Sequence, residues 1–152
     1  GWRLGWMLVP AELRRAVDCL TGNFTICPPV LPQHAAVAAF TRESIAEADG
    51  HLRHYARNRE TLLTGLRRIG LTRLAPADGA FYVYADVSEF TADSLRWCEE
   101  LLTYTGLALA PGIDFDTVTG GSFVRLSFAG PAGDIDEALA RLGPWLSQGP
   151  RR

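Results

Sequence analysis

The sequence predicts an α/β fold, because stretches with helical spacing of apolar residues alternate along the chain with short runs that favour strands. The longest helical pattern ends at Gly70, beyond which an aromatic and β-branched run at residues 80–85 is followed by another helical pattern. The chain has 152 residues, 47% of them hydrophobic and 21% charged, which is the composition of a globular protein able to bury a core.

The first third of the chain predicts one strand and two short helices before the long helix. Residues 4–9 are mostly apolar and are interpreted as a buried strand. Residues 23–32 contain three prolines and are expected to be irregular, and a helix is expected at 33–40. Apolar residues at helical spacing define the helix between them (Leu13, Ala16, Val17 and Leu20) and the long helix (Ile45, Ala48, Leu52, Tyr55, Leu62, Leu66 and Ile69).

After the strand at 80–85, a helix is expected from about Ala92, with Thr91 as its N-cap and Gly106 as its end. Two further strands are expected at 107–110 and 123–128. The loop 111–116 and a turn at Gly120 and Gly121 separate these strands, and the last helix is expected to begin at Asp134, which has capping-box spacing to Glu137. The residues expected to face inward are Leu95, Cys98, Leu101 and Leu102 in the first helix and Ile135, Ala138, Leu139 and Leu142 in the second.

Composition excludes several classes of function. The net charge is −2, and apart from the terminal Arg151 and Arg152 there is no basic cluster, so the sequence offers no electrostatic footprint for nucleic acid. The apolar stretches are too short to span a bilayer. The three cysteines are odd in number and lack C-x-x-C spacing, which favours a reducing, cytoplasmic location with the cysteines as small buried hydrophobes.

Two arginines have the strongest functional potential. In the strand 123–128 the period of two places Arg125 and Ser127 on the face opposite Val124, and a guanidinium there could bind a carboxylate with two parallel hydrogen bonds. Taken alone, Arg125 is more often explained as an arginine on a solvated strand face. Arg3 lies between Trp2 and Trp6, where stacking on an indole is an equally ordinary explanation.

The order of several motifs resembles the class I/II aminotransferases, the fold-type I enzymes that depend on pyridoxal 5'-phosphate (PLP). The opening Gly1-Trp2-Arg3 resembles the segment just after the Schiff-base lysine of that family. The other matching segments are Cys27-Pro28-Pro29 followed by Gln33-His34-Ala35-Ala36, Gly79-Ala80-Phe81, Pro111-Gly112, and Val124-Arg125-Leu126-Ser127-Phe128. The resemblance covers nearly the whole chain.

The resemblance implies an architecture and a reaction. The chain would be the C-terminal part of a fold-type I transferase: residues 1–58 would end the large PLP-binding domain, and residues 59–150 would form the small α/β domain after a long linking helix. The complete enzyme would be a homodimer that transfers an amino group between an amino acid and a 2-oxo acid. Arg3 would bind the PLP phosphate, Arg125 the substrate carboxylate, and Gly79 and Phe81 would lie near the substrate.

The sequence contains no lysine, since all 15 of its Lys and Arg side chains are arginines. The Schiff-base lysine of the family would precede Gly1, so we expect a fragment with no catalytic residue of its own that is inactive alone and prone to associate. Two alternatives remain open: a truncated remnant that acts as a non-catalytic interaction module, and a PLP-dependent lyase or regulator of the same fold.

Other candidate residues are weaker. His51 and His54 have a spacing at which two imidazoles can share a metal, but no third ligand is evident, and they are interpreted as surface histidines; no metal site is predicted. Asp114 and Asp116 are expected to support a turn. Asp116 stands where many members of the resembled family carry glycine, which leaves the conformation of its loop open.

Overall fold

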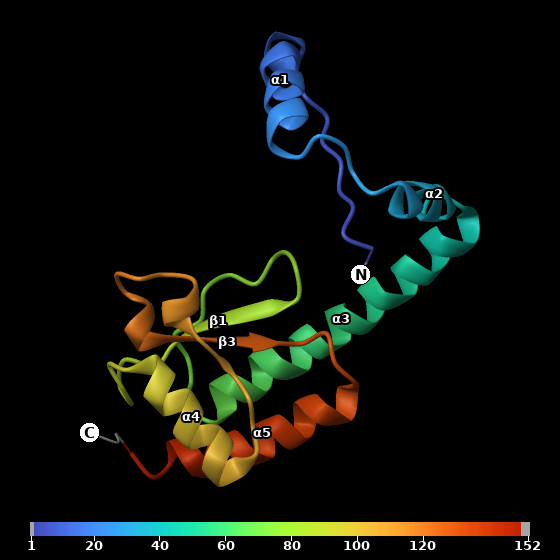
Figure 1. Ribbon diagram of the computed structural model, residues 1–152. Coiled ribbons are helices and arrows are strands. Elements are labelled where there is room, and N and C mark those ends of the chain that lie inside the picture. Colours follow the sequence, from blue (N-terminus) through green and yellow to red (C-terminus); the bar gives the residue numbers. More distant parts are fainter. Residues whose placement is uncertain (1, 150–152) are drawn as a thin grey trace. The chain divides into compact units, whose positions relative to one another are not determined.

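The computed structural model describes residues 2–149, so Gly1 of the opening motif and the pair Arg151 and Arg152 lie outside the described residues. The chain divides into two compact units, residues 1–51 and residues 52–152, called here the N-terminal and the C-terminal unit. The division falls within the long helix α3 (Arg42–Arg68), which also contains the domain boundary expected after residue 58 (Figure 1).

The N-terminal unit contains the 3-10 helix η1 (Ala11–Leu13), the helices α1 (Arg14–Phe24) and α2 (Val30–Ala38), and the start of α3. The helix α2 begins three residues earlier than the expected start at Gln33, with Pro29 as its N-cap. Pro32 therefore lies in its first turn, where a helix leaves backbone N–H groups without partners and a proline is tolerated.

The expected buried strand at residues 4–9 is wrong. This segment is irregular, and Leu8 is 97% exposed and Trp6 70% exposed. A strand needs a neighbouring strand for its N–H and C=O groups, and none of the described residues pairs with this segment. The apolar run alone therefore does not produce a strand here.

The C-terminal unit is built on a three-stranded antiparallel sheet with the order β1-β3-β2. Its strands are β1 (Tyr82–Asp86), β2 (Ala110–Pro111) and β3 (Phe123–Ser127). The expected strands 80–85 and 123–128 are confirmed with small shifts of their ends, whereas the expected strand 107–110 is reduced to the two residues of β2. The remaining elements of this unit are α4 (Ser94–Thr105), η2 (Gly112–Asp114), η3 (Gly120–Ser122) and α5 (Ala132–Leu146).

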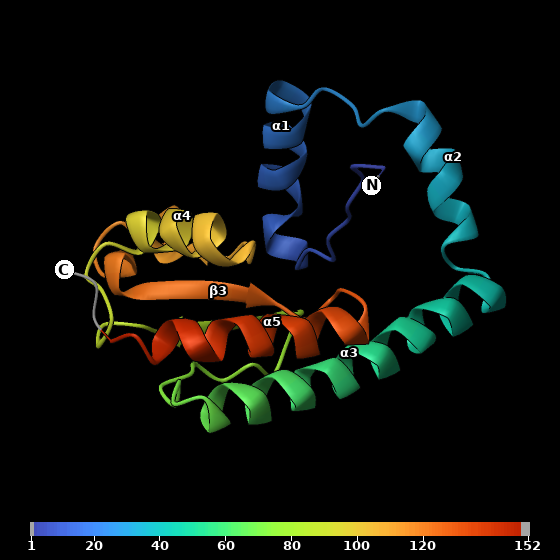
Figure 2. The ribbon, with the colours of Figure 1, turned by 90° about the horizontal axis from the view of Figure 1, so that it is seen from below.

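The two faces of the sheet differ in character. Val83, Ala85, Val124 and Leu126 are buried on the face that packs against α4, α5 and the later turns of α3, which lie on one side of the sheet in Figures 1 and 2. The alternation of side chains along a strand places Tyr82, Tyr84, Phe123 and Arg125 on the other face. The helices contribute the other side of the core, with Leu62, Leu63, Leu66, Trp97, Cys98, Leu101, Ile135, Leu142, Trp145 and Leu146 buried.

Two helix starts differ from expectation. The N-cap of α4 is Asp93, whose carboxylate accepts a hydrogen bond from the Arg96 N–H at 3.1 Å, and Thr91 instead accepts one from the Asp93 N–H. The helix α5 begins at Ala132 after Pro131, so Asp134 lies inside its first turn and the expected capping box is absent. The expected end of α4 at Gly106 is confirmed, because Gly106 has the left-handed conformation, with φ of 70°.

The expected burial was wrong at several positions. Leu95 and Leu102 of α4 are 51% and 49% exposed, and Trp97 packs into the core instead. Cys98 is buried as expected, and burial raises the pKa of its thiol to about 12, with a smaller effect of Asp114. Cys19 and Cys27 are exposed, contrary to the expectation that all cysteines are buried.

None of the helices within residues 2–149 combines the length and the apolar composition needed to cross a membrane.

Candidate functional site

Arg125 contacts two aromatic rings on the face of the sheet that turns away from the helices. Its guanidinium carbon is 4.2 Å from the centroid of the Tyr82 ring and 4.3 Å from that of the Phe115 ring. In the β1–β3 register Arg125 is opposite Tyr84, which makes Tyr82 its diagonal neighbour. Phe115 follows the 3-10 helix η2 in the loop between β2 and β3. We call Arg125, Tyr82 and Phe115 the arginine clamp.

The charge of Arg125 has no carboxylate partner among the described residues. Other arginines of the C-terminal unit do have one: Arg59 pairs with Asp78 at 3.1 Å and Arg73 with Asp86 at 3.2 Å. Arg125 is also partly buried, unlike a fully solvated surface arginine. A partly buried cation without a counter-ion is disposed to bind an anion.

Phe81 is connected to the clamp through Tyr82. The Phe81 ring lies 4.3 Å from the Tyr82 ring and 5.9 Å from the ring of Tyr55 on α3, and it packs against the core. Its carbonyl accepts a hydrogen bond from the Phe128 N–H at 2.9 Å, which extends the pairing of β1 with β3. Phe81 therefore supports the clamp from the core side.

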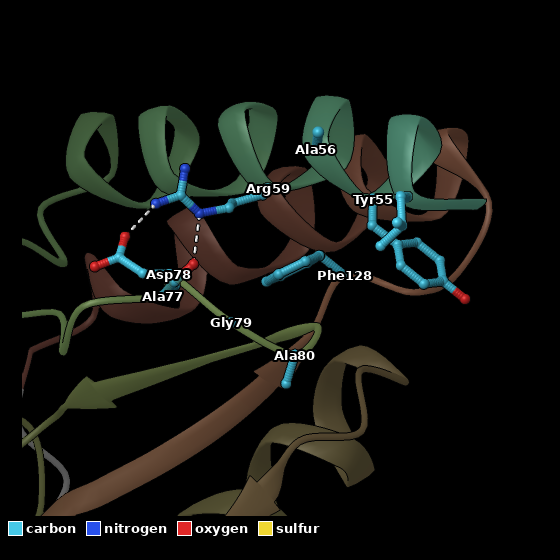
Figure 3. A pocket seen from close by; sticks show the side chains of 9 residues that line it. Tyr55, Ala56, Arg59, Ala77, Asp78, Gly79, Ala80 and Phe128 are labelled. Atoms are coloured by element: carbon cyan, nitrogen blue, oxygen red, sulfur yellow. Dashed lines mark hydrogen bonds and ion pairs between the residues drawn. The ribbon is translucent and has the colours of Figure 1, made fainter. Parts of the chain in front are cut away.

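Gly79 lies at a different place, in a pocket of about 330 Å³ between α3 and the segment before β1 (Figure 3). Arg59 spans this pocket, with its Nε donating to the Ala77 carbonyl at 2.6 Å and Nη2 pairing with Asp78. Arg125 does not line the pocket. The left-handed backbone conformation in this segment belongs to Ala80, with φ of 53°, and not to Gly79.

Hydrogen bonds fix the loop that carries Phe115. The Asp116 carboxylate accepts from the N–H of Val118 at 2.8 Å, from the N–H of Thr119 at 3.2 Å and from the Thr119 hydroxyl. The hydroxyl of Thr119, with the two N–H groups, lowers the pKa of the Asp116 carboxyl. Asp116 has no positive φ, so the loop does not need glycine at this position. Its carboxylate is used within the loop.

Tyr84 lies beside Arg125 on the sheet face that turns away from the helices. Its hydroxyl is buried and has no hydrogen-bond partner within residues 2–149. Its ring stacks on Phe123 with the centroids 4.9 Å apart and the planes 6° apart. Burial raises the pKa of Tyr84, and the nearby charge of Asp116 raises it further. Tyr84 therefore stays neutral next to the clamp, and it leaves the positive charge of Arg125 uncompensated.

Arg3 lies in the N-terminal unit and is exposed, with a positive φ of 59°. It lines a pocket of about 230 Å³ whose other walls are apolar and include Trp2, Trp6, Ala35 and Ala36. Among the described residues Arg3 forms no ion pair with an acidic side chain. Ala35 and Ala36 of the family-like segment 33–36 thus line the same pocket as Arg3.

His51 is exposed, as expected of a surface histidine, whereas His54 is partly buried, contrary to that interpretation. The His54 ring nitrogen Nε2 is 2.9 Å from the Gly130 carbonyl and 3.1 Å from the Asn58 amide nitrogen, and His51 lies 3.8 Å from Glu47. In the part of the chain that the structure describes, no group of three His, Cys, Asp or Glu side chains is placed to hold a metal ion.

Sequence reasoning missed Tyr82 and Phe115. Tyr82 could have been found, because the alternation in 80–85 places it on the same strand face as Tyr84, and pairing with the 123–128 strand brings that face to Arg125. Phe115 could not have been found in this way, because the path of an irregular loop is not encoded in a periodic pattern.

Comparison with known proteins identifies the family. Residues 1–142 match the family model of aminotransferase class I and II. A valine–pyruvate aminotransferase from Mycobacterium tuberculosis is 75% identical over 96% of this chain and 38% of its own length. An aspartate/prephenate aminotransferase from Thermus thermophilus is 35% identical over 97% of this chain and 38% of its own. The chain therefore belongs to the class I and II aminotransferase family, as its motifs suggested.

The fold agrees with this assignment. The crystal structure of an aminotransferase from Mycobacterium tuberculosis superimposes with a TM-score of 0.89 at 73% identity, over 97% of this chain and 38% of that one. The predicted α/β class of the fold-type I aminotransferases is confirmed. The chain spans 38% of the length of these relatives.

Proposed function

We propose that the complete protein containing this chain is a PLP-dependent aminotransferase that transfers an amino group between an amino acid and a 2-oxo acid. The family supports this reaction class. The observation that carries the proposal is the arginine clamp, in which Arg125 is partly buried, lies between Tyr82 and Phe115, and has no carboxylate partner among the described residues. Every amino-acid and 2-oxo-acid substrate carries a carboxylate that such a guanidinium can bind.

Arg3 is the proposed cofactor-binding residue. A phosphate group of nearly two negative charges calls for a cationic donor, and Arg3 supplies one at a pocket whose small Ala35 and Ala36 side chains leave room. Arg3 would therefore contact one side of the PLP phosphate. When bound, PLP would supply an electron sink for bond changes at the substrate's α-carbon. The chain has no lysine, so a lysine that holds the cofactor covalently would have to lie outside these 152 residues.

We further propose a small aliphatic amino acid, such as valine, as the amino donor and pyruvate as an acceptor. The support is the 75% identity with the valine–pyruvate aminotransferase. The loop beside Arg125 is consistent with this choice, because it exposes the apolar side chains Ile113, Phe115 and Val118. An aliphatic substrate side chain would find apolar contacts there.

The remaining assignments are also proposals. Residues 1–58 would belong to the large domain and 59–150 to the small one, in a homodimeric enzyme of the cytoplasm. Because lysine is absent, the isolated chain is proposed to be catalytically inactive, which agrees equally with a non-catalytic interaction module. Activity of the full-length protein as a transaminase, measured with valine and pyruvate, separates this proposal from a lyase or regulator of the same fold.

The test compares Arg125→Lys and Arg3→Ala in the full-length protein. Lysine keeps the charge of Arg125 but loses the two-pronged geometry, so kcat/KM should fall by an amount equivalent to roughly 2 to 4 kcal/mol, with PLP affinity nearly unchanged. Arg3→Ala should instead weaken PLP retention first. Two titrations on each variant measure this, one with PLP and one with isovalerate, a branched monocarboxylate that cannot be transaminated. If Arg125→Lys lost PLP but bound isovalerate normally, the two roles would be wrong.

A further inference from the structure

We propose that Tyr82 and Phe115 are positioning residues that hold the Arg125 guanidinium between two aromatic faces and thereby fix the plane in which a carboxylate binds. The inference rests on the proposed carboxylate-binding role of Arg125. The observation is the placement of the guanidinium carbon 4.2 Å from one ring centroid and 4.3 Å from the other, with the rings contributed by β1 and by the loop after η2.

An arginine that binds an anion is better oriented by aromatic rings than by carboxylates. Arg59 and Arg73 of the same unit are oriented by the acidic side chains of Asp78 and Asp86. A carboxylate orients an arginine but also neutralises it and occupies its donors. An aromatic face attracts the guanidinium while leaving its N–H groups free. Tyr82 and Phe115 can therefore orient Arg125 without competing with a substrate.

The geometry restricts how a carboxylate can approach. All five N–H donors of a guanidinium lie in its plane. Because the guanidinium carbon lies 4.2 Å and 4.3 Å from the centroids of two rings, the approach that we infer for a carboxylate is along the edge of the guanidinium, where it can form two parallel hydrogen bonds. The clamp thus favours the two-pronged contact over looser single contacts.

The two rings are held by different means. Tyr82 belongs to β1, is paired with Ser127, and packs on Phe81 with 4.3 Å between the ring centroids. Phe115 depends on its loop: its N–H donates to the Gly112 carbonyl at 2.9 Å, and the following Asp116 is tied to Val118 and Thr119. Phe115 is 52% exposed, so its position relies on this loop geometry and not on burial in the core.

The carboxylate next to the clamp in the sequence does not pair with Arg125. Asp116 follows Phe115 directly, but its oxygens accept hydrogen bonds from Val118 and Thr119 and form no ion pair with Arg125 among the described residues. The loop therefore places the Phe115 ring against Arg125, while the Asp116 carboxylate of the same loop forms its hydrogen bonds within the loop.

The experiment uses the full-length protein and measures isovalerate affinity by calorimetry. Phe115→Leu removes the ring but keeps an apolar side chain, and should weaken binding roughly 5-fold, whereas Phe115→Tyr keeps the ring and should bind like the parent. Tyr82→Leu and Tyr82→Phe form the same comparison for the other ring. Thr117→Ala is the matched loop control, because Thr117 is an exposed residue of the same loop and is neither part of the clamp nor one of the proposed apolar substrate contacts.

A double-mutant cycle with Arg125→Lys separates positioning from general damage. If Phe115 acts through the guanidinium, Phe115→Leu should have little further effect on isovalerate affinity once Arg125 is lysine. An equal loss in both backgrounds, or an unchanged affinity of Phe115→Leu, would overturn the clamp while leaving the carboxylate role of Arg125 standing. Normal binding by Arg125→Lys itself would instead refute the proposed function on which the clamp rests.

A spectroscopic measurement checks the geometry without activity. Nuclei of the Arg125 side chain between two rings should show upfield ring-current shifts in the NMR spectrum of the parent and of Phe115→Tyr. Phe115→Leu should reduce these shifts. Unchanged shifts in Phe115→Leu would mean that this ring does not cover Arg125 in solution.

Discussion

At the residue scale, the loop that carries Phe115 depends on Gly112 and Gly120, because a Cβ at either glycine would collide with the backbone of the other. A Cβ added to Gly112 would lie 2.5 Å from the Gly120 carbonyl oxygen, 2.6 Å from the Phe123 carbonyl oxygen and 2.7 Å from the Tyr84 hydroxyl. These are backbone atoms and a buried hydroxyl, which cannot move aside easily. Gly112 therefore allows the loop that carries Phe115 to lie against the start of β3 and the Tyr84 side chain of β1, and the requirement is one of space, since Gly112 has no positive φ.

This close approach predicts the effect of Gly112→Ala. The added methyl group should force the loop outward and destabilise the protein by about 1–3 kcal/mol, as overpacking of a filled interior does. Gly133→Ala is the matched control, because a Cβ at Gly133 in α5 meets nothing within 4 Å and alanine favours a helix. Urea unfolding of the two variants measures the difference. Equal stabilities would show that the Gly112 site can relax at no cost.

At the scale of elements, the helix starts of the C-terminal unit depend on side chains that sequence patterns only partly identify. Both Asp93 and Asp134 precede apolar helical patterns, but only Asp93 accepts a capping hydrogen bond, from the N–H of Arg96. Asp134 lies within the first turn of α5, where the N-cap is Pro131 and no side chain caps the helix. The two aspartates should therefore contribute differently to stability.

Replacing the true cap should be the more damaging change. Asp93→Ala removes the acceptor for the Arg96 N–H and should lower the free energy of unfolding by about 1 kcal/mol. Asp134→Ala loses only a favourable charge near a helix N-terminus, about 0.3–0.5 kcal/mol. Thermal unfolding of both variants gives the comparison. A larger loss for Asp134→Ala than for Asp93→Ala would mean that the capping box operates in solution.

The elements that sequence could predict are those with a local cause. The long helix α3 could be predicted from its apolar stripe, and the end of α4 from a glycine suited to the left-handed conformation. The period of two placed Arg125 on the strand face away from Val124. The prediction of a strand at residues 4–9 was wrong because a strand depends on partner strands that a local pattern does not reveal. The expected burial of Leu95 was wrong because an apolar stripe does not show which neighbours cover it. Phe115 was missed because loop geometry, and not a periodic pattern, brings it to Arg125.

At the scale of the whole molecule, the two units differ in how much apolar surface they bury. Within the described chain, every buried hydrophobic side chain comes from Leu62 or later, in the C-terminal unit. The N-terminal unit contains none and exposes many large apolar residues. The exposed ones are Trp2, Trp6, Met7, Leu8, Leu13, Leu20, Phe24, Ile26, Val30, Leu31, Val37, Phe40 and Ile45. Helices in water gain most of their stability from packing an apolar face, so α1 and α2 have little to hold them in this chain by itself.

This difference predicts unequal protection of backbone amides from hydrogen exchange in the 152-residue chain. Amides of α1 and α2 should exchange far faster than those of α4 and α5, because local opening requires little loss of burial in the first pair and disrupts the core in the second. In the full-length protein, where the proposed remainder of the large domain covers them, α1 and α2 should become protected as well. Mass spectrometry measures hydrogen exchange in both proteins. Light scattering establishes whether each protein is monomeric. Slow exchange of α1 in a monomer of the chain alone would show that the N-terminal unit is stable without further partners.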